Sequence, residues 1–140
     1  MQAEILRVKL RHFEDEIAAA AAVAVIYDEA LGRDFEFLQL PEGAEPSHNE
    51  YVFLAKDKEQ ADKIKKALAG KGWSASSLPM LMLHTLDFYH DSKYTTSAED
   101  FPGAQVLSDR LVRLPISPYL DVVWQNEIIN TVWECLDAAE

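Results

Sequence analysis

The densest group of possible metal ligands in the sequence is the segment from His84 to Asp91. It reads His-Thr-Leu-Asp-Phe-Tyr-His-Asp, so two histidines and two aspartates fall within eight residues. Imidazole and carboxylate groups are ligands that suit zinc or iron. However, the spacing matches no known two-histidine helical site, and no third histidine is nearby. We therefore predict no metal site, and we interpret His84 and His90 as exposed or bonded to local backbone.

Nucleophilic chemistry has equally weak candidates. Ser74, Ser76 and Ser77 precede His84, but the sequence contains no Gly-x-Ser-x-Gly element or other nucleophile signature. Serines at a strand end or a turn usually bond the backbone. Cys135, the single cysteine, falls among the apolar positions of the last helix, which predicts a buried structural thiol. We expect no catalytic residue in this set.

Composition restricts the class of protein that must position these side chains. The 140 residues are enough for one domain with a hydrophobic core, and 49% of them are hydrophobic. A net charge of -11 argues against a nucleic-acid partner, because phosphate backbones are bound by clustered Lys and Arg. The longest apolar run, residues 17–26, is about half the length of a membrane span. With a single cysteine, the sequence predicts a soluble protein of a reducing cytoplasm.

Residues 1–31 have the spacing of one long helix. Apolar residues recur every three or four positions along it: Leu6, Leu10, Phe13, Ile17, Ala20, Ala24, Tyr27 and Leu31. Gly32 then favours a helix end. We expect the stripe formed by Leu6, Leu10, Phe13, Ile17 and Ala24 to pack on a sheet. Because residues 17–26 include no charge, a second side must also be covered, formed by Ala19, Ala22, Val23 and Ile26.

The remaining sequence alternates short strands and helices. An irregular connection over 33–49 leads to a strand over 50–55, and Asp57 caps a helix that extends to about Ala69. A second strand is predicted over 73–77, a long loop over 78–94, and a helix over 99–109 with Val106 and Leu107 buried. A third strand over 111–114 precedes a helix over 121–138, whose buried side is marked by Val123, Ile128, Val132 and Leu136.

This order of elements predicts an α+β fold. We expect a small, mostly antiparallel sheet covered by helices. The whole chain, residues 1–140, is interpreted as a single domain, with a long helix over 1–31 and an α+β body over 50–138.

Several segments, in order, resemble the C-terminal small domain of the DegT/DnrJ-type sugar aminotransferases. The sequence from 110 to 120, Arg-Leu-Val-Arg-Leu-Pro-Ile-Ser-Pro-Tyr-Leu, is similar to the last segment of these enzymes. Residues 2–10 and 26–31 are similar to the start and end of the family's interdomain helix, and residues 51–53 to its first small-domain strand. The stretch from Gly72 through Leu78, Pro79 and His84 resembles the family's substrate-side loop.

The resemblance implies where the chemistry of such an enzyme would lie. Transamination by pyridoxal phosphate needs a lysine amine, a carboxylate for the pyridine nitrogen and a phosphate cup. In the family these belong to a large domain, which is expected upstream of the residues present here. None of the eight lysines resembles the cofactor lysine, so we expect pyridoxal phosphate only if a separate large-domain chain supplies the site. Leu78, Pro79, His84 and His90 would be relics of the substrate loop.

Three functions remain open at this stage. The first is a non-catalytic, self-associating protein; the second is the C-terminal half of a split aminotransferase; the third is a small-molecule, sugar-binding module. Relatives usually carry charged residues over part of 18–22, where this chain has only alanine. Small apolar residues permit close helix–helix approach, and an identical chain is the simplest partner. We therefore favour a homodimer or larger homo-oligomer with an interface at Ala19, Ala22, Val23 and Ile26.

Overall fold

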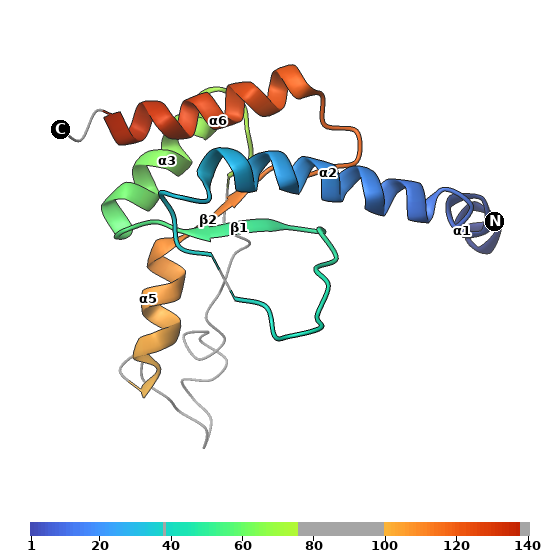
Figure 1. Cartoon of the computed structure of the whole chain (residues 1–140), viewed down its shortest axis with the longest axis horizontal. Helices are drawn as coiled ribbons and strands as arrows, with labels where there is room; N and C mark the ends of the chain where they lie inside the picture. Colours follow the sequence, from blue (N-terminus) through green and yellow to red (C-terminus); the bar gives the residue numbers. More distant parts are fainter. Residues whose placement is uncertain (38, 76–99, 138–140) are drawn as a thin grey trace.

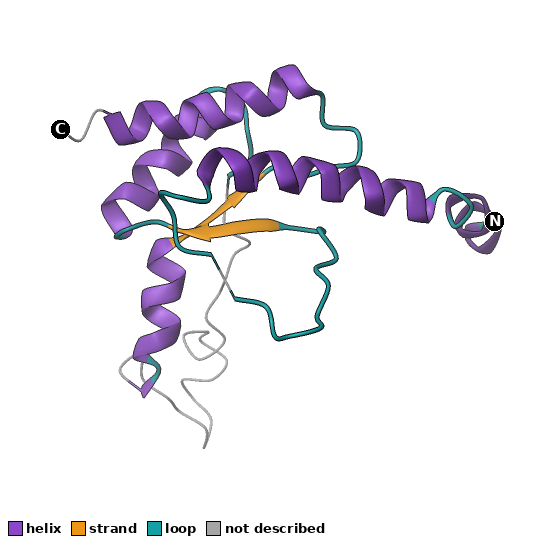
Figure 2. Cartoon of the chain, viewed as in Figure 1, coloured by secondary structure: helices purple, strands orange, loops and turns teal. Residues whose placement is uncertain are grey.

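The computed structural model describes residues 1–37, 39–75 and 100–137 (Figure 1). Its elements are α1 (Gln2–Lys9), α2 (Phe13–Leu31), β1 (Tyr51–Leu54), α3 (Lys58–Gly70), α5 (Pro102–Arg110), β2 (Leu111–Leu114) and α6 (Val122–Asp137). The predicted α+β class, with an antiparallel sheet covered by helices, is confirmed (Figure 2). Within the described ranges, no helix combines the length and apolar character that crossing a bilayer requires.

The two strands form the floor on which the main helices pack. They pair antiparallel, with Tyr51 opposite Leu114 and Phe53 opposite Val112. Because side chains alternate along a strand, these four residues share one face, and all four are buried. Helix α3 packs on both β2 and α6, and α2 packs along α6. The ring of Tyr27 on α2 lies 4.9 Å from that of Tyr51, so α2 also rests on the sheet.

The C-terminal half of α2 belongs to the core. Its buried residues are Ala20, Val23, Ala24, Tyr27 and Leu31. The Tyr27 hydroxyl donates to the carbonyl oxygen of Pro115 at 2.9 Å. The buried Gln125 amide on α6 donates to the carbonyl oxygen of Val23 at 2.7 Å. One partly buried and one buried hydrogen bond therefore fix α2 against the end of β2 and against α6.

Several predicted boundaries are confirmed. Helix α2 ends at Leu31, and Gly32 follows where a β-carbon would collide with the carbonyl oxygen of Asp28. Asp57 caps α3 by accepting a 2.9 Å hydrogen bond from the amide of Gln60. Both strands lie where the sequence placed them, and Cys135 is buried as expected.

The single helix predicted over 1–31 is wrong. The structure has two helices, α1 and α2, with a turn over residues 10–12. The expected packing of Leu6, Leu10, Phe13 and Ile17 on the sheet is also wrong, because these side chains are 39–66% exposed. The two-stranded sheet is too small to reach them, and α2 enters the core only from Ala20 onward. Residues 1–12, called the arm below, project from the body (Figure 1).

The strand predicted over 73–77 is not a strand in its described part, residues 73–75. The amides that a strand would use close α3 instead. The amide of Trp73 donates to Leu68 at 2.9 Å and that of Gly72 to Ala69 at 3.0 Å. Gly72 has a φ of +87°, the left-handed conformation that such a helix end requires. The amide of Trp73 therefore belongs to the end of α3 and does not pair with a strand.

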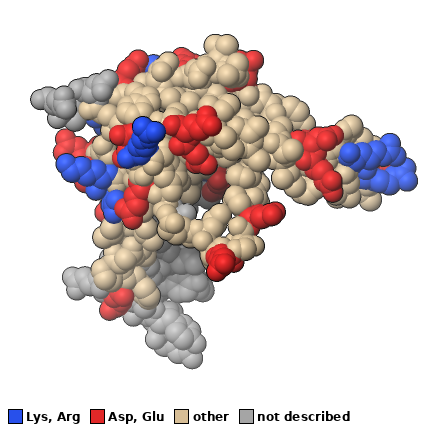
Figure 3. All heavy atoms as spheres, in the orientation of Figure 1, with Lys and Arg blue, Asp and Glu red and all other residues tan. Residues whose placement is uncertain are grey.

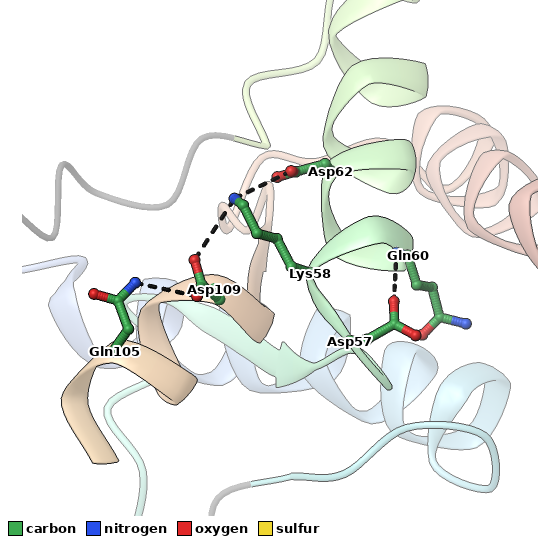
Figure 4. A network of polar contacts seen from close by, with 6 residues as sticks. All are labelled: Asp57, Lys58, Gln60, Asp62, Gln105 and Asp109. Carbon is green, nitrogen blue, oxygen red and sulfur yellow. Dashed lines mark hydrogen bonds and ion pairs between the residues drawn. The ribbon is translucent and has the colours of Figure 1, made fainter. Parts of the chain in front are cut away.

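Helix α5 is attached by polar rather than apolar contacts, so the predicted burial of Val106 and Leu107 is wrong; both are exposed. The ammonium of Lys58 on α3 lies 3.2 Å from Asp62 and 3.6 Å from Asp109 on α5 (Figure 4). Gln105 donates to the same Asp109 carboxylate at 3.1 Å. The last turn of α5 therefore has an ion pair with α3, while the apolar pair lies at the surface.

The predicted buried side of α6 is correct except at its start. Ile128 and Val132 are fully buried and Leu136 packs against the core, but Val123 is 69% exposed. Gln125 faces the core in its place, because its amide has a partner on α2. Because the polar Gln125 occupies a core position, the apolar residues alone predicted a buried side that is displaced by part of a turn at the start of α6.

Candidate functional site

The candidate site is centred on the segment over 115–120, which follows β2. Residues of this segment line each of the three hollows described below. Tyr27 holds its first residue through the carbonyl of Pro115. The amide of Leu120 donates to Ser117 at 3.1 Å, which closes a turn. The hydroxyl of Tyr119 donates to the carboxylate of Glu16, which fastens the turn to α2. Hydrogen bonding to Glu16 raises the pKa of the Tyr119 hydroxyl.

On one side of this segment is a polar hollow of about 320 Å³. Its lining residues are Asn49, Glu50, Trp73, Ser74, Arg113, Leu114, Pro115, Ile116, Ser117 and Leu120. The two charged members, Arg113 and Glu50, bind each other at 3.0 Å, and both are about one-third exposed or less. Because this pair neutralises the lining, the hollow suits a neutral polar molecule better than a phosphate or a carboxylate.

On the other side is a larger, more apolar hollow of about 430 Å³, called the α2 hollow below. Its lining residues are Phe13, Glu16, Ile17, Ala20, Ser47, His48, Asn49, Ile116, Ser117 and Pro118. His48 adopts a left-handed φ of +50° where residues 47–49 turn along the edge. A smaller hollow of about 280 Å³ adjoins it and includes Asp15 and Glu16. The apolar floor thus has a carboxylate rim at the start of α2.

The charges of this region are unevenly distributed. Arg7, Lys9 and Arg11 are exposed on the arm, whereas the first turn of α2 carries Glu14, Asp15 and Glu16. Figure 3 shows the basic tip next to acidic side chains where α2 begins. On the rest of the visible face, acidic and basic side chains are interspersed.

The described residues do not fit pyridoxal phosphate. No lysine lines any of these three hollows. A phosphate often binds at a helix N-terminus, but at α3 the Asp57 carboxylate already accepts from a backbone amide, and at α6 the Asp121 carboxylate accepts from the amide of Val123. Helix α2 begins with three acidic residues, which would repel a phosphate. We therefore derive no step through this cofactor from these residues.

The predicted site residues have different outcomes. His84, His90, Leu78 and Pro79 lie outside the described residues. Elsewhere in the described ranges, no group of three or more His, Cys, Asp or Glu is placed to hold a metal.

The predicted interface side of α2 is divided in the structure. Ala22 is exposed and Ala19 half-buried, so both are available at the surface. Val23 is only 7% exposed and belongs to the core, and Ile26 packs against that core. The assignment of Val23 to an outward-facing side is therefore wrong, because the helix turns this residue toward α6.

Comparison with known proteins identifies the family. The model of the DegT/DnrJ/EryC1/StrS aminotransferase family matches residues 1–133. The chain belongs to this family. The family is pyridoxal-phosphate dependent, and a putative sugar aminotransferase of Streptococcus pneumoniae to which this chain is similar has been solved in its PLP-form.

Individual relatives agree with this assignment. The chain is 27% identical over 132 residues to the erythromycin biosynthesis sensory transduction protein EryC1 of Saccharopolyspora erythraea, covering 94% of this chain and 35% of that protein. A DegT DnrJ EryC1 StrS aminotransferase from Brucella abortus is 28% identical with a TM-score of 0.79, covering 95% and 34%. DesV of S. venezuelae is 20% identical with a TM-score of 0.83, covering 95% and 35%, which shows a shared fold. The chain thus spans about a third of the length of these relatives.

Sequence reasoning missed the two side-chain pairs that shape the hollows. Glu16 with Tyr119 and Glu50 with Arg113 are far apart in sequence, so no spacing motif relates them. One signal was present for Arg113, which lies between Val112 and Leu114 and must point to the face opposite theirs. Its partner on β1 could not be inferred without the register of the strands.

Proposed function

We propose that this chain is a non-catalytic member of the aminotransferase family that acts by association, as a homodimer or larger homo-oligomer. The observation that carries the proposal is the apolar surface of the arm. Ile5, Leu6 and Leu10 are 55–66% exposed, and no residue of α1 is buried. Apolar side chains grouped on a projecting helix are typical of association surfaces.

The absence of a cofactor role is supported by the chemistry of the described lysines. Lys58 pairs with Asp62 and Asp109, Lys71 with Glu134, and Lys63 donates to the carbonyl oxygen of Cys135. Each of these ammonium groups holds two elements together rather than facing a hollow. Burial lowers the pKa of Lys65, but this residue lines none of the hollows described above.

A second candidate is the C-terminal part of a pyridoxal-phosphate sugar aminotransferase whose large domain is a separate chain. The observation that favours it is that the chain covers only about one-third of each relative. In this case the arm would contact the large domain, and that domain would supply the lysine and the phosphate cup. The two candidates differ in the partner that covers the apolar surface of the arm: a second copy in the first, and a large-domain chain in the second.

The proposal is tested with the purified chain. Sedimentation or light scattering at tens of micromolar should give an oligomer. Incubation with pyridoxal phosphate and borohydride should give no specific lysine adduct, and no amine should transfer to a nucleotide-linked keto sugar. A wild-type monomer, or a trapped adduct on one lysine with amine transfer, would refute the proposal.

Substitutions locate the interface. Leu6→Glu should shift the protein toward monomer if the arm associates. Ala22→Glu should do so if the exposed alanine side does. Ile26 is not a suitable probe, because it packs against the core and its replacement by Glu would disturb folding.

A further inference from the structure

The arm and the α2 hollow have complementary surfaces. The arm carries Arg7, Lys9 and Arg11 against a single acid, Glu4, which gives it a formal charge of +2. The whole chain carries -11, so the remaining residues carry -13. The arm is therefore a basic region at the end of a chain whose total charge is negative (Figure 3). Its apolar side chains are exposed in the same helix.

The α2 hollow offers what such an arm needs. Its floor is apolar, formed by Phe13, Ile17, Ala20, Ile116 and Pro118. Phe13 and Ile17 are 53% and 39% exposed, so the floor is open to a partner. Its acidic rim faces the incoming basic groups. An amphipathic helix that lays apolar side chains into an apolar groove is a common mode of recognition.

The arm of the same chain is held away from this hollow. A continuous series of backbone hydrogen bonds crosses the turn between α1 and α2. Leu10 donates to Leu6 at 2.9 Å, Arg11 to Val8 at 3.2 Å and His12 to Lys9 at 3.0 Å. The turn thus fixes the direction of the arm, which extends beyond the end of α2 (Figure 1).

We propose that the arm of one copy docks in the α2 hollow of a second copy, and that the second arm returns the contact. Lys9 and Arg11 of one copy then approach Asp15 and Glu16 of the other, while Leu6 and Leu10 cover the apolar floor. Because each copy has one arm and one hollow, a two-fold arrangement satisfies both at once and closes the assembly as a dimer. This inference rests on the proposed self-association and names its surface, its partner and its charges.

Charge reversal tests the contact by sedimentation equilibrium. Lys9→Glu with Arg11→Glu makes the arm acidic, and Asp15→Lys with Glu16→Lys makes the rim basic. Each variant alone should dissociate with a Kd raised roughly tenfold or more, because like charges then meet. A one-to-one mixture of the two variants should recover association, since every arm again meets a rim of opposite charge. The control, Lys56→Glu with Lys66→Glu, gives the same change of net charge as the arm variant at exposed positions outside the contact and should leave Kd unchanged.

Cross-linking provides a second measurement that does not depend on charge. Wild-type residues Leu6 on the arm and Ser47 at the hollow are exposed, so cysteines there should not disturb folding. A mixture of Leu6→Cys and Ser47→Cys chains treated with a short bismaleimide should yield covalent dimers, more than either chain alone. The buried Cys135 serves as an internal background.

The outcomes separate the two proposals. A wild-type monomer at every concentration overturns both self-association and the docking mode. A wild-type dimer that is insensitive to both charge variants, or whose mixture is not restored, overturns only the docking mode. If the chain is a monomer that binds a large-domain chain of the family through its arm, the docking mode is overturned, because the large-domain chain covers the arm instead of a second copy. Weakening by each variant together with recovery in the mixture supports the arm exchange.

Discussion

Tyr27 connects the core to the candidate site, and Tyr27→Phe tests that connection. The ring is fully buried, and the change removes only the hydroxyl that donates to the carbonyl oxygen of Pro115 at 2.9 Å. The ring contact with Tyr51 and the buried apolar area are retained. The carbonyl of Pro115, a half-buried residue, loses this donor, which should cost about 0.5–1.5 kcal/mol. For a chain of this length that corresponds to a fall in Tm of roughly 2–7 °C.

The measurement is urea unfolding followed by tryptophan fluorescence, with thermal unfolding as a second probe. Tyr119→Phe is the matched control, because it also removes a hydrogen-bonded hydroxyl, but from a side chain that is 76% exposed. Its cost should stay within about 0.5 kcal/mol. Equal losses for the two variants, or no loss for Tyr27→Phe, would refute the argument that the bond to Pro115 anchors the segment over 115–120.

Three further substitutions or conditions test the fold. Gly32→Ala should destabilise by about 1–3 kcal/mol, because its β-carbon meets the backbone carbonyl of Asp28, whereas Gly70→Ala, which meets nothing, should be neutral or stabilising in thermal unfolding. Gln125→Met should cost about 0.5–1.5 kcal/mol, because it loses the hydrogen bond to Val23. Gln125→Ala should cost about 2–4 kcal/mol, because it also leaves a cavity, and urea unfolding would measure both variants. Burial raises the pKa of the Tyr27 and Tyr51 hydroxyls above the ordinary 10.0. The unfolded chain then loses these protons first. The contribution of the two tyrosines to stability should therefore be constant below about pH 10 and fall above it, by up to about 1.4 kcal/mol per pH unit for each tyrosine, in urea titrations at several alkaline pH values.

The sequence predicted those elements whose limits are set locally. Local residues specify each of them without reference to distant ones: Asp57 the cap of α3, Gly32 the end of α2, and the alternating residues over 51–54 and 111–114 the two strands. The amphipathic pattern over 1–31 was read correctly as helix but not as two helices. Periodicity reports which residues could share a face, and the size of the sheet decides how many of them are covered.

The hollows were much harder to predict. They arise where residues 47–50, the start of α2 and the segment over 115–120 meet, and these segments share no motif. His84 and His90 are the candidate site residues that stand out in the sequence, and they lie outside the described residues. Exposure of Val106, Leu107 and Val123 was unpredictable for a related reason. On α5 the described contact with α3 includes the Lys58–Asp109 ion pair, and on α6 the buried side chain at the start of the helix is the polar Gln125.

The same contacts fix α2 in the body without using the arm. Helix α2 is fixed in its C-terminal half by three hydrogen bonds, through Tyr27, through Gln125 and between Tyr51 and Asp28 at 2.7 Å. None of these involves a residue before Val23, and burial in α2 begins at Ala20. Residues 1–12 take part in none of these bonds, so exchanging the charges of the arm should leave the fold intact. The proposed docking would cover the basic, apolar arm with the acidic, apolar surface of a second copy.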